Sequence, residues 1–253
     1  MPTLSVIIIT RNEEANLEAC LSSLEGLAQQ IVVVDTNSSD RTREIAQNHG
    51  ALISQPPDWP GFGPQKNRAL DLASSEWVLS LDADERLTPA LRAEIVNAIN
   101  NPARINCFAI PRLSWYCGRF IRHSGWSPDY VERLFKRGSA RFSDDLVHER
   151  LIPSGPVAKM SNPMLHYSFM NYSQVLQKID RYSTASAEQA FARGKTSSPL
   201  KAVTHGLWAF VRTYLLQAGF LDGPQGFALA ISNGQGTYYR YIKLWQLHQD
   251  AKQ

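Results

Sequence analysis

The chain of 253 residues is long enough for one large domain, or for one domain with a C-terminal appendage. Its composition, with 43% hydrophobic and 19% charged residues, is typical of a globular protein and excludes a disordered or fibrous one. The formal net charge of +3 is too small to indicate nucleic-acid binding by bulk electrostatics.

Cysteine content and hydropathy give expectations about location. Cys20, Cys107 and Cys117 form no C-x-x-C pair, and their odd number argues against a disulfide framework. We expect no signal peptide, because residues 1–10 have no basic segment and no small-residue cleavage site. The most apolar window, residues 206–221, is interrupted by polar residues and is too short to span a bilayer. The sequence therefore predicts a cytoplasmic protein, with contact at the inner face of the cytoplasmic membrane left open.

The first hundred residues alternate between strand and helix patterns. Runs rich in β-branched residues predict buried strands at residues 4–10, 31–34, 51–54 and 77–81. Helices are predicted after each strand, ending near residues 24, 49, 73 and 99, with N-caps that include Asn12 and Thr88. This alternation predicts βαβ units and a parallel sheet, so the expected fold class is α/β.

The pattern changes after residue 104. Short apolar runs with frequent Gly, Pro and aromatic residues predict a mixed β region over residues 105–166. Helical patterns follow at about 172–193, 199–219 and 224–248. We expect one domain over residues 1–170, with halves 1–104 and 105–170, and a helical extension over 171–253.

Polar clusters follow three of the predicted strands, at residues 10–14, 35–40 and 82–86. Ligands of parallel α/β sheets bind beyond the carboxyl ends of the strands. The three clusters are therefore expected to line one crevice.

Acidic residues in these clusters are the first candidates for chemistry. Asp82 and Asp84 bring two negative charges together, which suits Mg²⁺ or Mn²⁺ shared with a diphosphate. The alternative is that both residues only cap the helix near Thr88. Asp35 can accept hydrogen bonds from a base or a ribose hydroxyl, or can simply form an Asx turn.

Basic and amide side chains near the same crevice can supply donors to phosphates. These residues are Arg11, Asn12, Lys66, Asn67 and Arg68. Taken singly, each is equally consistent with a solvated surface position.

In combination, these segments resemble a known family. Residues 6–14, 32–42 and 79–85, with residues 61–70 between the last two, are similar to the N-terminal signatures of the family 2 glycosyltransferases. The segments Arg133-Leu-Phe-Lys-Arg137, Val147-His-Glu149 and Leu165-His-Tyr167 resemble single-domain bacterial enzymes that add glucose or a similar sugar to the lipopolysaccharide inner core.

The resemblance implies a GT-A fold, with residues 1–104 as the nucleotide-sugar-binding half and 105–170 as the acceptor-side half. It also implies that Asp35 contacts uracil or ribose, that Asp82 contacts the ribose or supports the site, and that Asp84 ligates a divalent metal. Further donor-binding positions by the same resemblance are Thr10, Arg11, Asn12, Glu13, Lys66, Asn67 and Ala83.

The expected chemistry needs charge stabilisation and a base. A metal and basic side chains would stabilise the diphosphate leaving group, and inversion needs a base on the opposite face of the sugar. Glu149 is favoured as the catalytic base because it matches the subgroup's acidic residue, and Asp145 is the second candidate. His148 can be a base, a ligand or a hydrogen-bond donor. By resemblance His166 is a second metal ligand; judged alone, it is a core histidine, and a metal-free site also stays open.

Residues 112–141 combine seven basic and two acidic residues with interleaved aromatic residues. Such a mixture can bind single-stranded nucleic acid, but it also suits a phosphorylated sugar acceptor. Trp126 and Arg133 are the candidate acceptor-binding residues, and a solvated loop with structural aromatics is the alternative. Aromatic and basic residues on the C-terminal helices allow contact with lipid headgroups, or packing against the catalytic domain or a second copy.

The sequence thus predicts an inverting, metal-assisted glycosyltransferase that moves a sugar, expected to be glucose, from a UDP-sugar to a lipopolysaccharide-core or other surface-glycan acceptor. A nucleotidyltransferase is the alternative enzyme, but residues 10–14 lack the Gly-rich basic loop that it needs. An NAD-dependent enzyme is disfavoured because no G-x-G-x-x-G follows the first strand. A non-catalytic glycan- or nucleic-acid-binding module is the remaining alternative.

Overall fold

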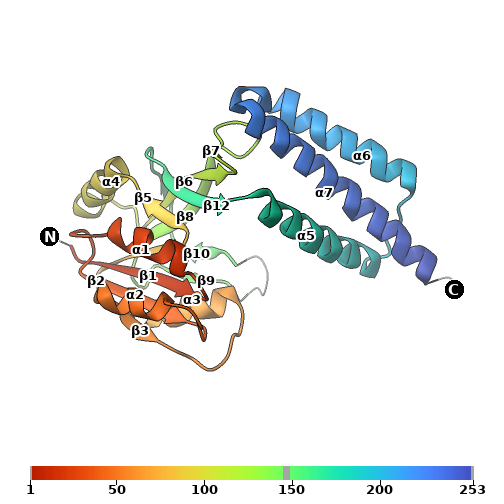
Figure 1. Ribbon diagram of the computed structural model, residues 1–253. Helices are drawn as coiled ribbons and strands as arrows, with labels where there is room; N and C mark the ends of the chain where they lie inside the picture. Colours follow the sequence, from red (N-terminus) through yellow and green to blue (C-terminus); the bar gives the residue numbers. More distant parts are fainter. Residues whose placement is uncertain (1, 145–148, 252–253) are drawn as a thin grey trace. The chain divides into compact units, whose positions relative to one another are not determined.

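The computed structural model describes residues 2–144 and 149–251. The chain forms two compact units (Figure 1). The N-terminal unit comprises Met1–Arg112 and Asp129–His166, and the C-terminal unit comprises Leu113–Pro128 and Tyr167–Gln253. Strands β6 (Cys107–Tyr116) and β12 (Met164–Phe169) each begin in the first unit and end in the second.

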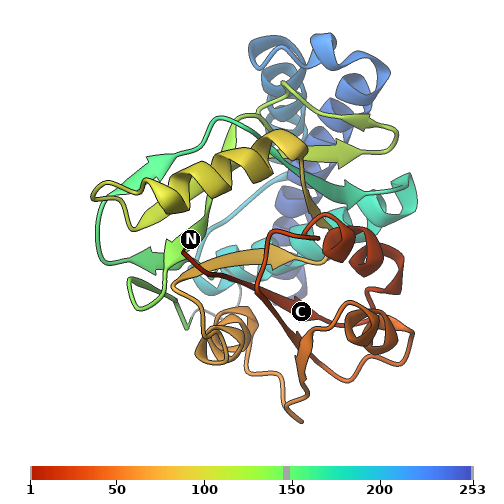
Figure 2. The ribbon, with the colours of Figure 1, turned by 90° about the vertical axis from the view of Figure 1, so that its left-hand side faces the viewer.

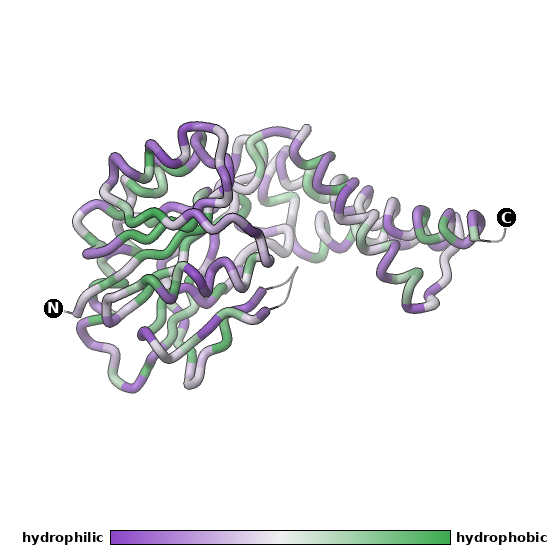
Figure 3. The backbone as a smooth tube through the Cα atoms, turned by 90° about the horizontal axis from the view of Figure 1, so that it is seen from below, coloured by the Kyte–Doolittle hydropathy of each residue, from purple (hydrophilic) through white to green (hydrophobic). Residues whose placement is uncertain are grey.

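Four parallel strands form the first part of the sheet of the N-terminal unit. Their order is β3 (Leu52–Ser54), β2 (Gln30–Asp35), β1 (Leu4–Thr10) and β4 (Trp77–Asp82). β1 is central, and its side chains alternate between two hydrophobic clusters: Val6 and Ile8 join one, and Ile7 and Ile9 join the other. A strand buried on both faces explains why this segment reads as a continuous β-branched run. Figure 3 shows these apolar segments gathered on the strands of the unit.

Helices cover both faces of this sheet (Figure 2). Helices α1 (Glu14–Ser22), α2 (Thr42–Asn48) and α4 (Pro89–Asn100) contribute apolar residues to one cluster, and α3 (Phe62–Asp71) contributes to the other. Helix α4 begins as predicted, because the Thr88 side chain accepts a hydrogen bond from Leu91 N at 3.1 Å and Pro89 occupies the first turn.

The predicted cap of α1 is wrong. Glu13, not Asn12, precedes the helix, and the Glu13 side chain makes no capping hydrogen bond. Asn12 has a positive φ of 56°, and its side-chain oxygen accepts a hydrogen bond from Ser39 N at 2.9 Å. Asn12 therefore links two loops at the end of the sheet.

The rest of the sheet is mainly antiparallel. β8 (Asp129–Lys136) pairs antiparallel with β4 and β6, and β12 lies between β6 and β5 (Glu85–Leu87). β11 (Val157–Lys159) pairs parallel with β6, and β9 (Ala140–Phe142) with β10 (Leu151–Pro153) forms a separate antiparallel pair. The short strand β5 was not predicted: after residues 82–84 the chain turns back into the sheet before α4 begins.

The C-terminal unit consists of a small β segment and helices. It contains β7 (Arg119–Phe120), α5 (Tyr172–Ala192), α6 (Pro199–Val211) with a π-helical turn η1 (Arg212–Leu216), a 3₁₀ turn η2 (Gly219–Asp222) and α7 (Gly223–Asp250). Both α5 and α6 pack against α7. A Cβ at Gly206 of α6 would lie 3.1 Å from Gly234 O of α7, so glycine permits close approach of the two helices. Among the described helices, none is both long and apolar enough to cross a bilayer.

Residues 113–128 were predicted within the acceptor-side half but are part of the C-terminal unit. The reason is a shared core, in which Tyr116 and Ile121 pack with Phe169, Val175 and Leu229. The second segment of the C-terminal unit, Tyr167–Gln253, begins four residues before the expected start of the helical extension at residue 171.

Candidate active site

The carboxyl ends of β1, β2 and β4 lie side by side in the N-terminal unit. Strand register places Thr10 opposite Asp35 and Ile9 opposite Asp82. The acidic residues that end two separate strands therefore flank the end of the strand between them. The parallel register places the polar clusters at one edge of the sheet, but their residues line separate pockets there and not the single crevice that the sequence predicted.

Asp35 is fully buried and anchors the turn that follows β2. One carboxylate oxygen accepts a hydrogen bond from Ser38 N at 3.0 Å, and the other accepts from Thr10 Oγ1 at 3.0 Å and Ser38 Oγ at 2.5 Å. The local Asx-type contact that the sequence left open is thus present. These hydrogen bonds link the polar cluster at residues 10–14 to the one at residues 35–40.

Asp82 lies between two cations. Its Oδ1 is 3.0 Å from Lys66 Nζ, and its Oδ2 is 2.5 Å from an Arg133 NH2 group that also lies 2.6 Å from Glu85 Oε1. Burial by itself would raise the pKa of Asp82, but the charges of Arg133 and Lys66 outweigh it and hold that pKa well below its usual range. Asp82 is therefore ionised, and one third of its side chain is still exposed to the pocket beside it.

Glu85 is the acidic residue of this cluster that sequence reasoning missed. It is fully buried, and it accepts a hydrogen bond from Asp82 N at 2.9 Å in addition to its contact with Arg133. Burial raises the pKa of Glu85, an effect that the charge of Arg133 only partly offsets. The signal in the sequence was the third acidic residue of the segment 82–85.

Asp84 and His166 come together through the unpredicted strand pair. In the antiparallel pair of β5 and β12, Glu85 lies opposite His166. Asp84 directly precedes Glu85 in the chain, so it lies near His166 as well. His166 Nε2 lies 3.4 Å from Asp84 Oδ2, and the two side chains keep 19% and 29% of their surface exposed. His166 is therefore not a fully buried core residue. Neither Asp82 nor Asp84 caps α4, because Thr88 performs that role.

Lys66 connects Asp82 to Glu149. Lys66 Nζ is 3.1 Å from Glu149 Oε1, and the Lys66 side chain is only 6% exposed. Helix α3 can present Lys66 here because Gly63 lies against the neighbouring loop: a Cβ at Gly63 would be 1.8 Å from Ser143 O and 3.4 Å from the Glu149 Cβ. Lys66, Asp82, Arg133 and Glu149 line a pocket of 600 Å³.

A second pocket, of 290 Å³, adjoins the end of β1. Thr10, Arg11 and Glu13 line it together with two aromatic residues, Trp59 and Phe62, whose rings meet edge to face at 5.0 Å. Burial raises the pKa of Glu13 in its wall. Trp59 and Phe62 were not predicted to contribute to the site, and the signal for them in the sequence was two aromatic residues close together in a loop.

Several candidate residues have structural contacts that the sequence did not indicate. The Asn67 amide bonds both to Phe142 O at 2.9 Å and to Phe142 N at 3.0 Å, and so holds β9 against α3. Ala83 is buried in the hydrophobic core. Arg133 is nearly buried and is paired with Asp82 and Glu85 within the N-terminal unit. Asp145 and His148 lie outside the described residues.

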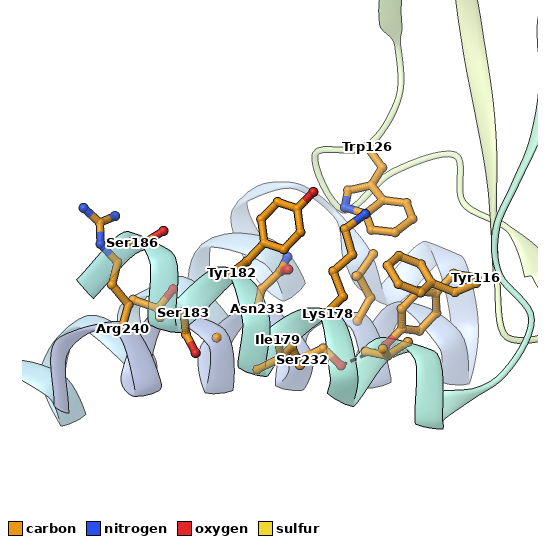
Figure 4. Close-up of a pocket in the computed structure, with 15 residues that line it drawn as sticks. Tyr116, Trp126, Lys178, Ile179, Tyr182, Ser183, Ser186, Ser232, Asn233 and Arg240 are labelled. Atoms are coloured by element: carbon orange, nitrogen blue, oxygen red, sulfur yellow. Dashed lines mark hydrogen bonds between the residues drawn. The ribbon is translucent and has the colours of Figure 1, made fainter. Parts of the chain in front are cut away.

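Trp126 belongs to the C-terminal unit, where it borders a pocket of 340 Å³ between α5 and α7. Figure 4 shows Trp126 and Tyr116 at one end of this pocket and Arg240 at the other, with Lys178 and Tyr182 between them. Tyr116 is held by a 2.8 Å hydrogen bond to Ser232 of α7. The pocket combines aromatic walls with two basic side chains.

Comparison with known proteins identifies relatives of the whole chain. It is 30% identical over 256 residues to the lipopolysaccharide core biosynthesis glycosyltransferase LpsC of Rhizobium meliloti, covering 97% of this chain and 93% of that protein. It is 28% identical over 258 residues to an uncharacterized glycosyltransferase of Rickettsia typhi, covering 98% and 88%.

Two solved structures are similar to parts of this chain. One is TarS of S. aureus, with 18% identity and a TM-score of 0.49 over 65% of this chain and 36% of that one. The other is glucosyl-3-phosphoglycerate synthase from Mycobacterium tuberculosis, with 28% identity and a TM-score of 0.37 over 46% and 44%.

The fold class predicted from the sequence is confirmed: a mixed α/β sheet has flanking helices and is followed by C-terminal helices. Residues 5–154 match the family described as "Glycosyl transferase family 2". This match spans more than half of the chain, and the relatives similar over nearly its full length are glycosyltransferases. The chain therefore belongs to the family 2 glycosyltransferases and is a glycosyltransferase.

Proposed function

We propose that this enzyme transfers a sugar, with inversion, from a UDP-sugar to a lipopolysaccharide-core or other surface-glycan acceptor, and that the sugar is glucose. The observation that carries the proposal is the cluster at the carboxyl ends of β2 and β4, where Asp35 and Asp82 flank the end of β1 beside Lys66 and Glu149. Likeness to a lipopolysaccharide core glycosyltransferase supports the acceptor class.

The donor would lie along this edge of the sheet. The 290 Å³ pocket with Thr10, Arg11 and Glu13 would take the nucleoside, and Trp59 and Phe62 would offer aromatic faces to its base. Asp35, Asn12 and Asn67 would act here mainly by fixing the loops, since their side chains already bind neighbouring residues. Ala83 would act through its backbone, because its side chain is buried.

Asp84 and His166 are the residues that would hold a divalent cation, Mg²⁺ or Mn²⁺. Their 3.4 Å approach supports this, since a carboxylate oxygen and an imidazole nitrogen at that separation can share one ion. Among the residues described, no group of three or more His, Cys, Asp and Glu side chains is gathered for a metal, so the donor phosphates would supply further oxygens. When bound, the cation would neutralise charge on the diphosphate.

Glu149 would act as the base. Its carboxylate would accept the proton of the acceptor hydroxyl while that oxygen bonds to the anomeric carbon and the bond to the diphosphate breaks. Lys66 would orient Glu149 and Asp82 and add positive charge near the leaving group. Asp145 is kept as the alternative base.

The C-terminal unit would contribute to acceptor binding. Trp126 supports such a role, because it borders an aromatic pocket with Lys178 and Arg240 that suits a phosphorylated sugar. Arg133 would act indirectly, by holding Asp82 in place. A glycolipid acceptor would place the enzyme at the cytoplasmic face of the membrane.

A donor screen tests the proposal. Thermal unfolding would be measured with UDP-glucose and other nucleotide sugars, with Mn²⁺ and with EDTA, and release of nucleoside diphosphate would be measured in the same mixtures. We expect a Mn²⁺-dependent rise in melting temperature with one UDP-sugar, lost in Asp84→Asn and retained in Asp71→Asn, an exposed carboxylate paired with Arg141. No stabilisation by any UDP-sugar would contradict the proposed donor.

A further inference from the structure

The outer face of α6 is apolar. Leu200, Val203 and Leu207 follow one another at three- and four-residue intervals and so lie on one side of the helix. Their exposed fractions are 74%, 46% and 62%. The buried residues of the helix, Ala202 and Gly206, lie on the other side. An ordinary surface helix presents polar residues to water. Helix α6 instead presents large apolar side chains to water and buries small residues.

The apolar surface continues from α6 onto η1, η2 and α7. A groove of 510 Å³ between α6 and α7 is lined by Val203, Leu207, Phe210, Ile231 and Tyr239, among others. At the end of α6, three further aromatic residues pack around one another: Tyr214 lies 5.4 Å from Phe227 and 6.3 Å from Phe220.

Leu215, Leu216 and Leu221 around these turns are each more than half exposed. The surface is therefore a contiguous patch, which we call the α6–α7 face. It is defined by Leu200, Val203, Leu207, Phe210, Tyr214, Leu215, Leu216, Phe220, Leu221, Phe227, Ile231 and Tyr239. Contiguous apolar surface of this kind marks an interaction site.

The exposed charged residues within residues 189–249 are all basic. Residues 189–249 contain six Lys and Arg residues and a single acidic residue, Asp222. Asp222 is fully buried and accepts hydrogen bonds from Arg122 N, His123 N and Ser124 Oγ. The α6–α7 face therefore has exposed Lys201 and Arg212 beside it and no acidic residue of this segment at its surface.

This charge pattern distinguishes between possible occupants. A second copy bound through the same face would bring like charges together without a carboxylate from residues 189–249 to pair with them. An anionic lipid surface provides a partner for each kind of side chain: hydrocarbon for the leucines and phosphates for Lys201 and Arg212.

We propose that the α6–α7 face inserts shallowly into the surface of an anionic lipid membrane, with Lys201 and Arg212 at the level of the lipid phosphates. The proposal deepens the membrane location proposed above by assigning the surface that makes the contact. It uses no residue of the donor site, so its failure and the failure of donor binding are separate results.

Vesicle flotation with the full chain tests this proposal. Without donor or acceptor, the wild type should float with vesicles of phosphatidylcholine mixed with phosphatidylglycerol, and much less with phosphatidylcholine alone. Raising the salt concentration should weaken binding, because the screening length falls from about 10 Å at 0.1 M to about 3 Å at 1 M. The double variant Leu200→Glu, Leu207→Glu should lower the vesicle partition coefficient by about tenfold or more, since two exposed apolar side chains lose their lipid contact.

A matched control replaces two exposed leucines of the N-terminal unit. Leu52 and Leu72 are 47% and 39% exposed, and the variant Leu52→Glu, Leu72→Glu adds the same charge elsewhere. It should bind vesicles much more strongly than the Leu200→Glu, Leu207→Glu variant. Circular dichroism checks folding, and Lys201→Ser with Arg212→Ser should reduce the salt-sensitive part of binding with the leucines intact.

Three results would overturn the proposal. They are wild-type protein that does not float with anionic vesicles, a leucine variant that floats as well as the wild type, and equal binding to neutral and anionic vesicles. A wild-type dimer in analytical ultracentrifugation that Leu200→Glu, Leu207→Glu converts to monomer, without vesicle binding by either, would instead assign the face to a second copy.

Discussion

Arg133 joins Asp82, at the end of β4, to Glu85, at the start of β5. Its guanidinium contacts both Asp82 and the fully buried Glu85, while Lys66 neutralises the other oxygen of Asp82. Removing one residue of this buried charged cluster would leave a charge without a partner. The intact cluster holds the side chain of Asp82 in position. The sequence placed Arg133 at the acceptor because a basic residue near aromatics suggests phosphate binding. Its partners in the structure, Asp82 and Glu85, lie on β4 and β5, and the sequence pattern did not reveal this pairing.

Glu149 gives a prediction at the residue scale. Glu149→Gln keeps the shape of the side chain but removes its ability to take a proton, so turnover should fall by about 10²–10⁴-fold. Affinity for the donor, measured by titration calorimetry, should stay within a few-fold of wild type. Glu132→Gln is the matched control, because Glu132 lines the same 600 Å³ pocket, and it should retain turnover. Unchanged turnover in Glu149→Gln would remove Glu149 as the base.

Asp222 gives a prediction about pH. Burial by itself would raise the pKa of Asp222, but hydrogen bonds from Arg122 N, Ser124 and His123 outweigh it and lower that pKa. A carboxyl group whose pKa is lowered by folding stabilises the protein above its unfolded pKa of about 3.9, and this stabilisation is lost as the pH falls through the folded value. In thermal unfolding, Asp222→Asn should be less stable than wild type at pH 7, and the difference should shrink below about pH 4. A difference that does not change with pH would contradict this account.

At the scale of elements, most of the first hundred residues could be predicted, because each segment is specified locally. The β-branched run at residues 4–10 gives β1 with the predicted bounds, and Thr88-Pro89 gives the start of α4. Strand β5 could not be predicted: three residues carry little pattern, and β5 exists because it pairs with β12, about 80 residues later. That pairing brings Asp84 to His166, so the sequence could name the two residues but not supply their contact.

The contact of α3 with the Glu149 loop gives a prediction at this scale. In Gly63→Ala, the new methyl group would meet Ser143 O at 1.8 Å, so the helix or the loop must shift. We expect reduced thermal stability together with a fall in turnover, because both Lys66 and Glu149 depend on this contact. Gly155→Ala is the control: a Cβ there has nothing within 4 Å, and Gly155 does not have a positive φ. Wild-type turnover in Gly63→Ala would show that the loop is not held as described.

At the scale of the whole molecule, the chain divides its chemistry between two units. The N-terminal unit carries the acidic strand ends and their cations, and the C-terminal unit carries the apolar and basic helices. The sequence indicated an acidic strand-rich part and an apolar, basic helical part. It grouped residues 113–128 with the first part, whereas the structure packs them in the C-terminal unit. Their partners, Phe169, Val175 and Leu229, are distant in the sequence, and long-range packing of this kind leaves no periodic local signal.

The central claim is that acidic residues at the ends of separate parallel strands hold one nucleotide donor: Asp35 fixes the loop at the nucleoside end, and Asp84, just after β4, acts through a cation. Calorimetric titration of UDP into wild type, Asp35→Asn and Asp84→Asn, with Mn²⁺ and with EDTA, tests it most directly. With Mn²⁺, both variants should bind UDP about tenfold or more weakly than wild type, because Asp35→Asn weakens the hydrogen bonds that fix the loop and Asp84→Asn loses a charged contact with the cation. With EDTA, Asp84→Asn should bind like wild type while Asp35→Asn stays weaker. Wild-type affinity of both variants in Mn²⁺ would contradict the account.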